Sequence, residues 1–385
     1  MYGKTLLLRA AENGHEAVVE MLLEWDGVNP NTTDGQGRTP LSWAAENGHK
    51  EVARILLERG DVNPNTADKA GRTPLCWAVS NGREGIVSIL LERRDVNPNT
   101  AGPGGLTPLS KAAQDGREAI MRVLLERGDV NPNAADPGGE TPLCRAVWNR
   151  RVGAVRILLG RDEVNPNISG KWGWTPLLLA VYLGSWEVVP MLLDRSDLDP
   201  NIIDTKYGRT PLSWAADGDE EIVKMLLERD DVNPDTADKN GQTPLWLAAG
   251  WGYGGIVRVL LRWGAGCNTA DECGRTPLSR AARHGHEGVV RILLERSDIN
   301  PNTPDGEGRT PLMQAEEHAH KRIVKLLRDR ADSTPIYAAS LQPKEVSSSD
   351  LLEAPVHVHQ KKKRRPRGRR VREGRTHTAK RDELN

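Results

Sequence analysis

Between Asp34 and Asn63 the chain reads DGQGRTPLSWAAENGHKEVARILLERGDVN, and each part of this stretch has a physical role. The first four residues, two of them glycine, predict a turn. Thr39 is suited to cap the amino end of a helix, and Pro40 suits its first position, where a missing N–H costs nothing. Asn47-Gly48 predicts the end of that short helix. A second helix is predicted by the apolar residues Val52, Ile55, Leu56 and Leu57.

The same unit recurs along almost the whole chain. Thr-Pro-Leu returns at steps of 33 to 35 residues, and Thr5-Leu6-Leu7 is a degenerate first copy. The threonines of the later copies are Thr39, Thr73, Thr107, Thr141, Thr175, Thr210, Thr243, Thr276 and Thr310. A pair of helices that cannot bury its apolar faces alone must stack on its neighbours. The repeat therefore predicts an all-α solenoid of about ten helix–turn–helix units with short projecting β-hairpins.

The pattern Asp-x-x-Gly-Arg-Thr-Pro-Leu-x-x-Ala-Ala-x-x-Gly-His, followed by a Val/Ile-Leu-Leu helix, resembles the ankyrin repeat. The Val-Asn-Pro-Asn-Thr loop resembles a subtype found in the large multi-ankyrin proteins of filamentous fungi. The resemblance implies that the chain binds another protein through its concave face and hairpin tips. Two departures stand out. The histidine usual after Thr-Pro-Leu is absent, as at Ser42, so its hydrogen bond is altered, and the seventh unit has lost a residue between Ala215 and Asp219.

Composition and charge exclude several classes of protein. The chain has 53 basic and 53 acidic residues, but from Ala331 to Asn385 there are 13 basic and 7 acidic residues, a net charge of +6. The first 330 residues then carry 40 basic and 46 acidic residues, a net charge of −6, which does not fit a uniformly basic nucleic-acid coat. No stretch approaches the ~18 apolar residues of a membrane span. Four cysteines do not make a disulfide framework.

Three segments follow from these patterns. Residues 1–332 are predicted to form the repeat array, residues 333–355 a linker, and residues 356–385 a disordered basic tail. The basic run of the tail consists of Lys361, Lys362, Lys363, Arg364, Arg365, Arg367, Arg369 and Arg370. Such a run predicts a nuclear-import signal, an arm that binds nucleic acid or another polyanion, or a solvated tail without function. The expected location is cytoplasmic, nuclear or both.

No enzymatic, metal or cofactor site is predicted. Gly3-Lys4-Thr5 resembles the end of a phosphate-binding loop, but it lies in register with the repeat and lacks the preceding strand. His15, His49, His286 and His320 occupy one turn position of their units, so we interpret them as structural. Cys76 and Cys144 occupy one position two units apart, too far for a disulfide, and free thiols are also expected at Cys267 and Cys273. We expect no catalytic residue, metal ligand or cofactor.

The aromatic residues carry the prediction of a binding site. Trp43, Trp77 and Trp214 share one helix position and are expected to pack between repeats. Six others fall in units five to eight, at positions that contact partners in proteins resembling this one: Trp148, Trp172, Trp174, Tyr182, Tyr207 and Trp251. We expect an exposed aromatic row that binds a protein. The alternative is that these rings fold back to fill gaps in irregular repeats.

The function predicted is that of a non-enzymatic scaffold or adaptor, whose partner is another protein and not a membrane or a small-molecule substrate. Two alternatives stay open. In the first alternative, the array is the sensing part of a larger nucleotide-switched receptor or enzyme that continues upstream. In the second, the chain is a nuclear adaptor whose basic tail contacts nucleic acid or an import receptor. Salt-sensitive binding of the isolated tail to nucleic acid favours the latter alternative.

Overall fold

The computed structural model describes residues 4–332, and every regular element within them is helical. Each unit has an inner helix, which follows its threonine, and an outer helix. The inner helices are α1 (Leu6–Asn13), α3 (Pro40–Asn47), α5 (Pro74–Ser80), α7 (Pro108–Asp115), α9 (Pro142–Trp148), α11 (Pro176–Tyr182), α13 (Pro211–Ala215), α15 (Pro244–Trp251), α17 (Pro277–His284) and α19 (Pro311–Glu317). The outer helices are α2 (Glu16–Leu23), α4 (Lys50–Glu58), α6 (Glu84–Glu92), α8 (Glu118–Leu125), α10 (Val152–Leu159), α12 (Val188–Leu193), α14 (Glu220–Leu227), α16 (Gly254–Arg262), α18 (Glu287–Leu294) and α20 (Lys321–Asp332). The predicted all-α solenoid is confirmed.

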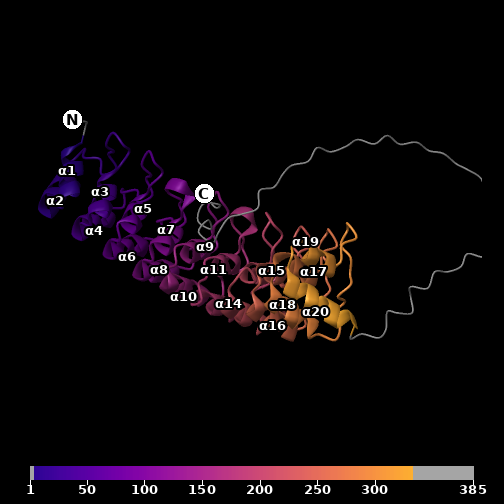
Figure 1. The fold of residues 1–385 in the computed structure, drawn as a ribbon. Helices are drawn as coiled ribbons and strands as arrows, with labels where there is room; N and C mark the ends of the chain where they lie inside the picture. Colours follow the sequence, from indigo (N-terminus) through magenta and orange to yellow (C-terminus); the bar gives the residue numbers. More distant parts are fainter. Residues whose placement is uncertain (1–3, 333–385) are drawn as a thin grey trace, which may run out of the picture. The chain divides into compact units, whose positions relative to one another are not determined.

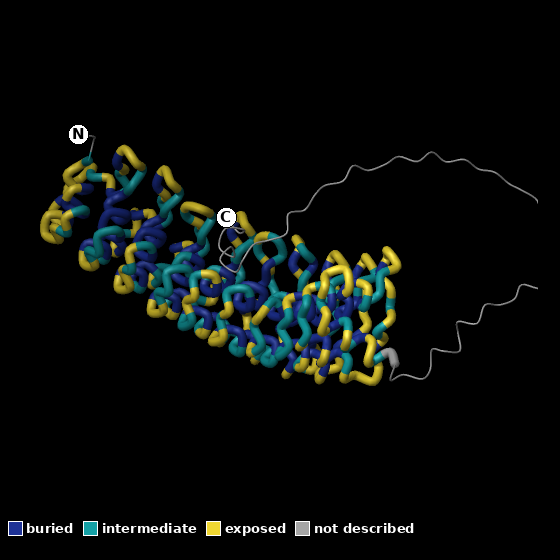
Figure 2. The backbone as a smooth tube through the Cα atoms, viewed as in Figure 1, coloured by how far each residue is buried: buried dark blue, intermediate teal, exposed yellow. Residues whose placement is uncertain are grey.

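The helices form two layers. Inner helices pack on the inner helices of neighbouring units and outer helices on outer ones, while the hairpins project along one edge (Figure 1). The leucine of Thr-Pro-Leu is at most 1% exposed in units two to nine, so it forms the centre of the core. Buried residues lie between the layers, and exposed ones gather at the hairpin tips and loop edges (Figure 2). The predicted linker and tail, from residue 333 onward, lie outside the described residues.

The repeated motifs act at the ends of the inner helices. Thr39 caps α3, because its hydroxyl oxygen accepts the N–H of Ser42 at 3.1 Å, and the Ser42 hydroxyl lies 3.0 Å from that of Thr39. Gly48 ends the helix with φ at 93°, in the left-handed region. His49 Nε2 then lies 2.9 Å from the carbonyl oxygen of Glu12 in the preceding unit. His286 and His320 make the same contact. These three histidines are therefore structural, as interpreted from the sequence, and each joins its unit to the preceding one.

A ladder of asparagine side chains joins the loops that follow the outer helices. Asn99 accepts the N–H of Asn131 at 2.8 Å and donates to the carbonyl of Asp129 at 2.7 Å. The same two bonds are made by Asn31, Asn65, Asn133, Asn167 and Asn201. Asp235 takes this place after α14, where it accepts the N–H of Gly266 at 2.8 Å. A carboxylate has no proton to donate, so this rung has one bond fewer.

An aspartate holds most of the hairpins at their base. Asp34 Oδ1 accepts the N–H groups of Gln36 at 2.8 Å and Arg38 at 3.0 Å. Its Oδ2 accepts from the Arg38 guanidinium at 3.3 Å and from the Trp43 indole at 3.2 Å. Backbone bonds close the loop on both sides of the turn, but residues 4–332 contain no β-strand. The projecting hairpins are therefore closed loops without a strand ladder. Gly102 and Gly170 replace the aspartate in units four and six.

Backbone bonds also join the tip of one hairpin to the next, though not everywhere. Lys69 donates to Gln36, and the equivalent bonds join units six to ten in sequence: Thr205 to Trp172, Lys239 to Tyr207, Glu272 to Asn240, and Gly306 to Cys273. The donor position is Pro103 in unit four and Pro137 in unit five, and proline has no N–H. No such bond joins Lys171 of unit six to unit five either, so among the described hairpins the tips form two linked groups, units two and three and units six to ten.

The first unit and the seventh depart from the pattern. In the first unit Leu6, Val18, Met21 and Trp25 are exposed, whereas Val52, which corresponds to Val18, is 1% exposed. The first unit therefore exposes apolar surface. Inner helix α13 of the seventh unit has only five residues, which agrees with the residue lost there. No helix within residues 4–332 has the length and apolar character needed to cross a membrane.

Candidate protein-binding surface

In the first three units the inner face is covered by an alternating stack of cations and indoles. Lys4 Nζ and the Arg38 guanidinium lie 3.6 and 3.5 Å from the centre of the Trp43 ring. Arg72 lies 3.9 Å from the centre of Trp77, and Arg38 reaches that ring at 5.7 Å. Trp43 and Trp77 are each 8% exposed, so the prediction that they pack between repeats is confirmed.

In units six and seven an aromatic cluster replaces this stack. Its members are Trp174, Tyr182, Tyr207 and Trp214, whose ring centres lie 4.9 to 5.7 Å apart in the contacting pairs. Trp174 occupies the position before threonine, where Arg38 stands in unit two. Both residues reach the indole of the following unit, Trp77 for Arg38 and Trp214 for Trp174. The cluster thus fixes unit six to unit seven through ring packing.

The prediction of an exposed row was wrong for Trp174, which is 5% exposed. Its ring turns inward because Gly170 leaves no aspartate beneath it and Trp214 of the next unit offers an apolar surface. Tyr182 and Tyr207 are half-buried against the same ring of Trp214. For these three residues the alternative interpretation, filling of gaps between repeats, describes the geometry better.

Two of the six predicted residues are exposed to solvent. Trp148, at the end of α9, is 37% exposed, and Trp251, at the end of α15, is 59% exposed. Trp251 donates its indole N–H to Asp217 of the preceding unit at 3.1 Å, which fixes the orientation of its ring. Trp172 lies half-buried at the hairpin tip of unit six. The structure therefore places two exposed indoles at inner-helix ends and the buried cluster in the units between them.

Ion pairs set the electrostatics of this face. Arg209 links two units, because its guanidinium contacts Asp217 at 3.0 Å and Asp238 at 3.3 Å. In unit two, burial pushes the pKa of Asp34 upward, but hydrogen bonds from the Arg38 and Gln36 N–H groups outweigh it and lower that pKa. In unit five burial raises the pKa of Glu140 despite its contact with Arg145. The Asp34 carboxylate thus anchors its hairpin, whereas that of Glu140 pairs with Arg145 of α9.

The described residues hold no metal-binding group of three or more histidine, cysteine or acidic side chains. All four cysteines are free thiols. Burial raises the pKa of Cys144 to about 11, so this thiol is a core residue without reactivity. Lys4, from the sequence that resembles a phosphate-binding loop, pairs with Glu12 at 2.6 Å and covers Trp43. Its ammonium therefore belongs to the repeat packing.

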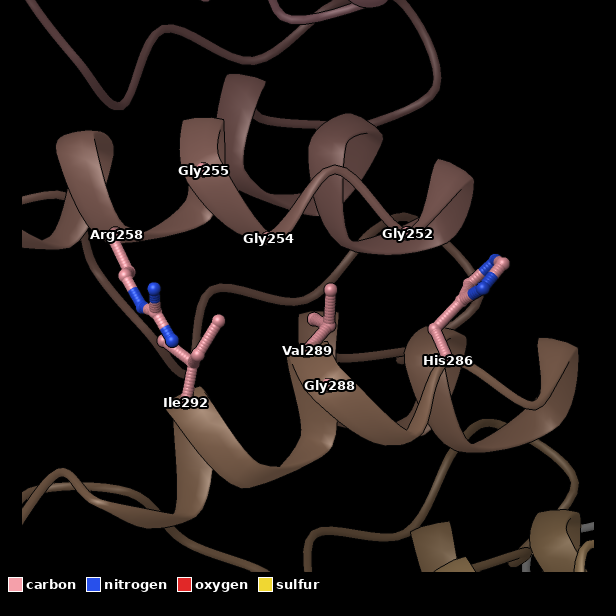
Figure 3. A pocket seen from close by; sticks show the side chains of 8 residues that line it. All are labelled: Gly252, Gly254, Gly255, Arg258, His286, Gly288, Val289 and Ile292. Atoms are coloured by element: carbon pink, nitrogen blue, oxygen red, sulfur yellow. The ribbon is translucent and has the colours of Figure 1, made fainter.

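A hollow of about 400 Å³ lies between outer helices α16 and α18 (Figure 3). Gly254 and Gly288 open it, because side chains are missing where these helices begin, whereas a side chain at Gly255 would meet Glu220 of α14. Arg258 and His286 contribute the polar groups of the hollow. The sequence signal was the pair Gly254-Gly255, which the repeat pattern alone did not mark as a surface feature. The hollow lies between the outer helices and reaches Gly252, the residue after Trp251 at the end of α15, but none of the six predicted site residues lines it.

The stacked helical pairs and their hairpin-lined inner face define a helical-repeat solenoid. The chain belongs to the ankyrin repeat family. The sequence model of the family described as ankyrin repeats (3 copies) matches residues 7–101, 94–170, 162–236, 218–305 and 264–335. Comparison with curated protein sequences gave no match. Among solved structures, the chain is similar to the ankyrin repeat domain of Bcl-3, described as a unique member of the IkappaB protein family. The identity is 28% and the TM-score 0.53, over 58% of this chain and 99% of the Bcl-3 domain.

Proposed function

We propose that the chain is a non-enzymatic scaffold or adaptor that binds another protein on its inner face and hairpin tips in units five to eight. The observation that carries the proposal is the exposure of Trp148 and Trp251, large apolar rings held at the ends of inner helices. Surface tryptophans are over-represented among the residues that dominate binding energy in protein interfaces. Ankyrin repeats are in general protein-interaction modules, which supports the same reading of this face.

The rings between these two indoles support the proposal in a different way. Trp174, Tyr182 and Trp214 form a packed floor, so the surface above them is fixed before a partner arrives. A rigid surface loses less conformational freedom on binding than a mobile one. Trp172 and Tyr207, at the hairpin tips, border the same region and complete the proposed site. Of the six predicted residues, Trp174 and Tyr182 act here through the packing of the floor.

The test compares tryptophans of similar exposure at different places. A protein captured by the chain is titrated against Trp251→Ala, Trp148→Ala and, as matched control, Trp263→Ala, since Trp263 is 45% exposed at the end of outer helix α16. We expect Trp251→Ala to weaken binding by about 2 kcal/mol, with the melting temperature nearly unchanged. The control should bind normally. Equal affinity of all three variants and the unchanged chain would refute the proposed surface.

The tail supports a second, separate proposal. Residues Lys361–Arg370 carry eight basic side chains, which favours a nuclear-import signal or a polyanion-binding arm and hence a nuclear location. Residues 356–385 fused to a fluorescent cargo too large to diffuse should concentrate it in nuclei, and alanine at Lys362, Lys363, Arg364 and Arg365 should abolish this. Cargo that stays in the cytoplasm with the intact tail would exclude import.

The loops between the units support a proposal about relatives. The Val-Asn-Pro-Asn-Thr loops resemble those of the multi-ankyrin proteins of filamentous fungi, and we propose that the chain is related to these proteins.

A further inference from the structure

Three successive hairpins carry an exposed lysine and a glycine at the tip, and unit three alone of the other described hairpins has this tip, at Lys69-Ala70-Gly71. The tips read Lys171-Trp172-Gly173, Lys206-Tyr207-Gly208 and Lys239-Asn240-Gly241, in units six, seven and eight. All three lysines are exposed. The tips on either side differ, with Pro137 in unit five and Glu272 in unit nine at the lysine position. We name Lys171, Trp172, Lys206, Tyr207 and Lys239 together the tip ridge.

The buried aspartates of two of these hairpins bond to their own backbone. Asp204 and Asp238 are 0% and 7% exposed, and each accepts N–H groups of its own hairpin. Within residues 4–332, neither Lys171 nor Lys239 lies within 4 Å of a carboxylate oxygen. Lys239 instead donates to the carbonyl of Thr205, and Lys171 lies 4.1 Å from the centre of the Trp172 ring. Lys171 and Lys239 therefore present positive charge on the tip ridge, beside aromatic surface.

The spacing of the three lysines is fixed by the backbone. Thr205 donates to the carbonyl of Trp172 at 2.7 Å, and Lys239 donates to that of Tyr207 at 2.9 Å. Stacked helices lie about 8–10 Å apart, so successive tips repeat at about that distance. An extended polyproline-II segment advances about 3.1 Å per residue and presents every third side chain on one face. Acidic residues at every third position of such a segment would match the lysines one for one.

The backbone conformation of Trp172 is an independent observation that indicates ligand binding at the tip. Its φ is 60°, in the left-handed region, where the equivalent residue of unit four is Gly104 with φ at 73°. A tryptophan in that conformation is strained relative to glycine. Strained residues gather at functional sites, where an interaction maintains them. The strained backbone of Trp172 therefore supports a contact made by its ring with a partner at the tip.

We propose that the tip ridge binds an extended acidic polypeptide segment with acidic side chains at every third position and an apolar side chain among them. The proposal deepens the proposed function, on which it rests, by naming the chemistry of the partner. A protein segment fits better than nucleic acid. Lys171 and Lys206 lie over the rings of Trp172 and Tyr207, which leaves bases little ring surface for stacking, and the first 330 residues carry a net charge of −6.

The experiment uses the full chain and two labelled peptides of equal composition, one with glutamate at every third position around a central leucine and one with the glutamates in a block. Lys171, Lys206 and Lys239 are changed together to glutamine. The matched control changes Lys50, Lys321 and Lys325, which are exposed and lie on outer helices, so the same charge is removed away from the hairpin tips. We expect the ridge variant to bind the spaced peptide at least 10-fold more weakly and the control less than 2-fold. The unchanged chain should prefer the spaced peptide.

Trp172→Gly separates binding from structure. It should weaken binding of the spaced peptide several-fold while the melting temperature stays the same or rises, because the strain at this residue is removed. Equal losses in both lysine variants, or no preference between the peptides, would overturn the proposal. Tighter, ridge-dependent binding of a labelled thymidine oligonucleotide would overturn it in favour of nucleic acid. If the ridge variants bind normally while Trp251→Ala still weakens a captured partner, the scaffold stands and the ridge proposal fails.

Discussion

Changing Trp174 to alanine is expected to lower the free energy of unfolding by about 3–5 kcal/mol, the usual cost of removing a buried tryptophan. The ring is 5% exposed, and its centre lies 4.9 Å from the ring centre of Tyr182 and 5.2 Å from that of Trp214. Because Trp214 belongs to the next unit, the loss falls on the contact between units six and seven. Urea denaturation followed by circular dichroism measures the change, and amide exchange should accelerate first in α11 and α13.

Trp251→Ala is the control for this prediction. Trp251 also belongs to the predicted aromatic row, but it is 59% exposed and makes one indole hydrogen bond, to Asp217. We expect its loss to cost about 1 kcal/mol or less. If Trp174→Ala melts like the unchanged chain, the cluster does not hold units six and seven together. If Trp251→Ala costs as much as Trp174→Ala, the exposed indole is part of the core.

Changing Asp34 to alanine is expected to cost about 3 kcal/mol of unfolding free energy. The side chain accepts four hydrogen bonds, from the N–H groups of Gln36 and Arg38, the Arg38 guanidinium and the Trp43 indole. Without it, the buried indole N–H loses its partner and the hairpin loses the group that fixes its turn. Thermal denaturation of the variant beside the unchanged chain measures the effect.

Asp34→Asn isolates the charge of the carboxylate. An asparagine keeps one acceptor for the N–H groups of Gln36 and Arg38, so we expect about half of the loss. The pH dependence has a definite sign. Because the folded pKa of Asp34 is lowered, its stabilisation is present above the ordinary aspartate pKa of about 3.9 and is lost as pH falls through the folded value. Stability of Asp34→Asn should therefore converge with that of the unchanged chain as pH falls below about 4, and a constant difference would contradict this.

The sequence predicted most of the fold because its signals are local. Thr39 and Gly48 determine where α3 begins and ends through bonds within a few residues. Because the motif recurs, the same interpretation applies to all ten units. The turn histidines were interpreted correctly because their position recurs. The exposure of Trp174 depends instead on Gly170 and on Trp214 one unit away, and no local signal contains that relation. The strain at Trp172 likewise became visible only with its backbone angle.

The asparagine ladder shows the same limit. The Val-Asn-Pro-Asn loops were visible as a repeat, but which atoms meet between units depends on how the units stack. Asp235 differs from an asparagine by one amide group, and only the bonding of Asn99 and its equivalents shows what that exchange removes. Sequence patterns therefore locate such residues, whereas their contribution follows from the contact between neighbouring units.

The missing tip links at Pro103 and Pro137 have a mechanical consequence. Where successive tips are bonded, bending the array must stretch a row of backbone hydrogen bonds as well as the helix contacts. Across units four and five the helix contacts and the asparagine ladder resist bending without these tip bonds. The array should therefore behave as an elastic rod with two stiff segments and a compliant one between them. A partner that spans the middle units would select the curvature of the rod, and the elastic energy of that deformation would enter its binding affinity.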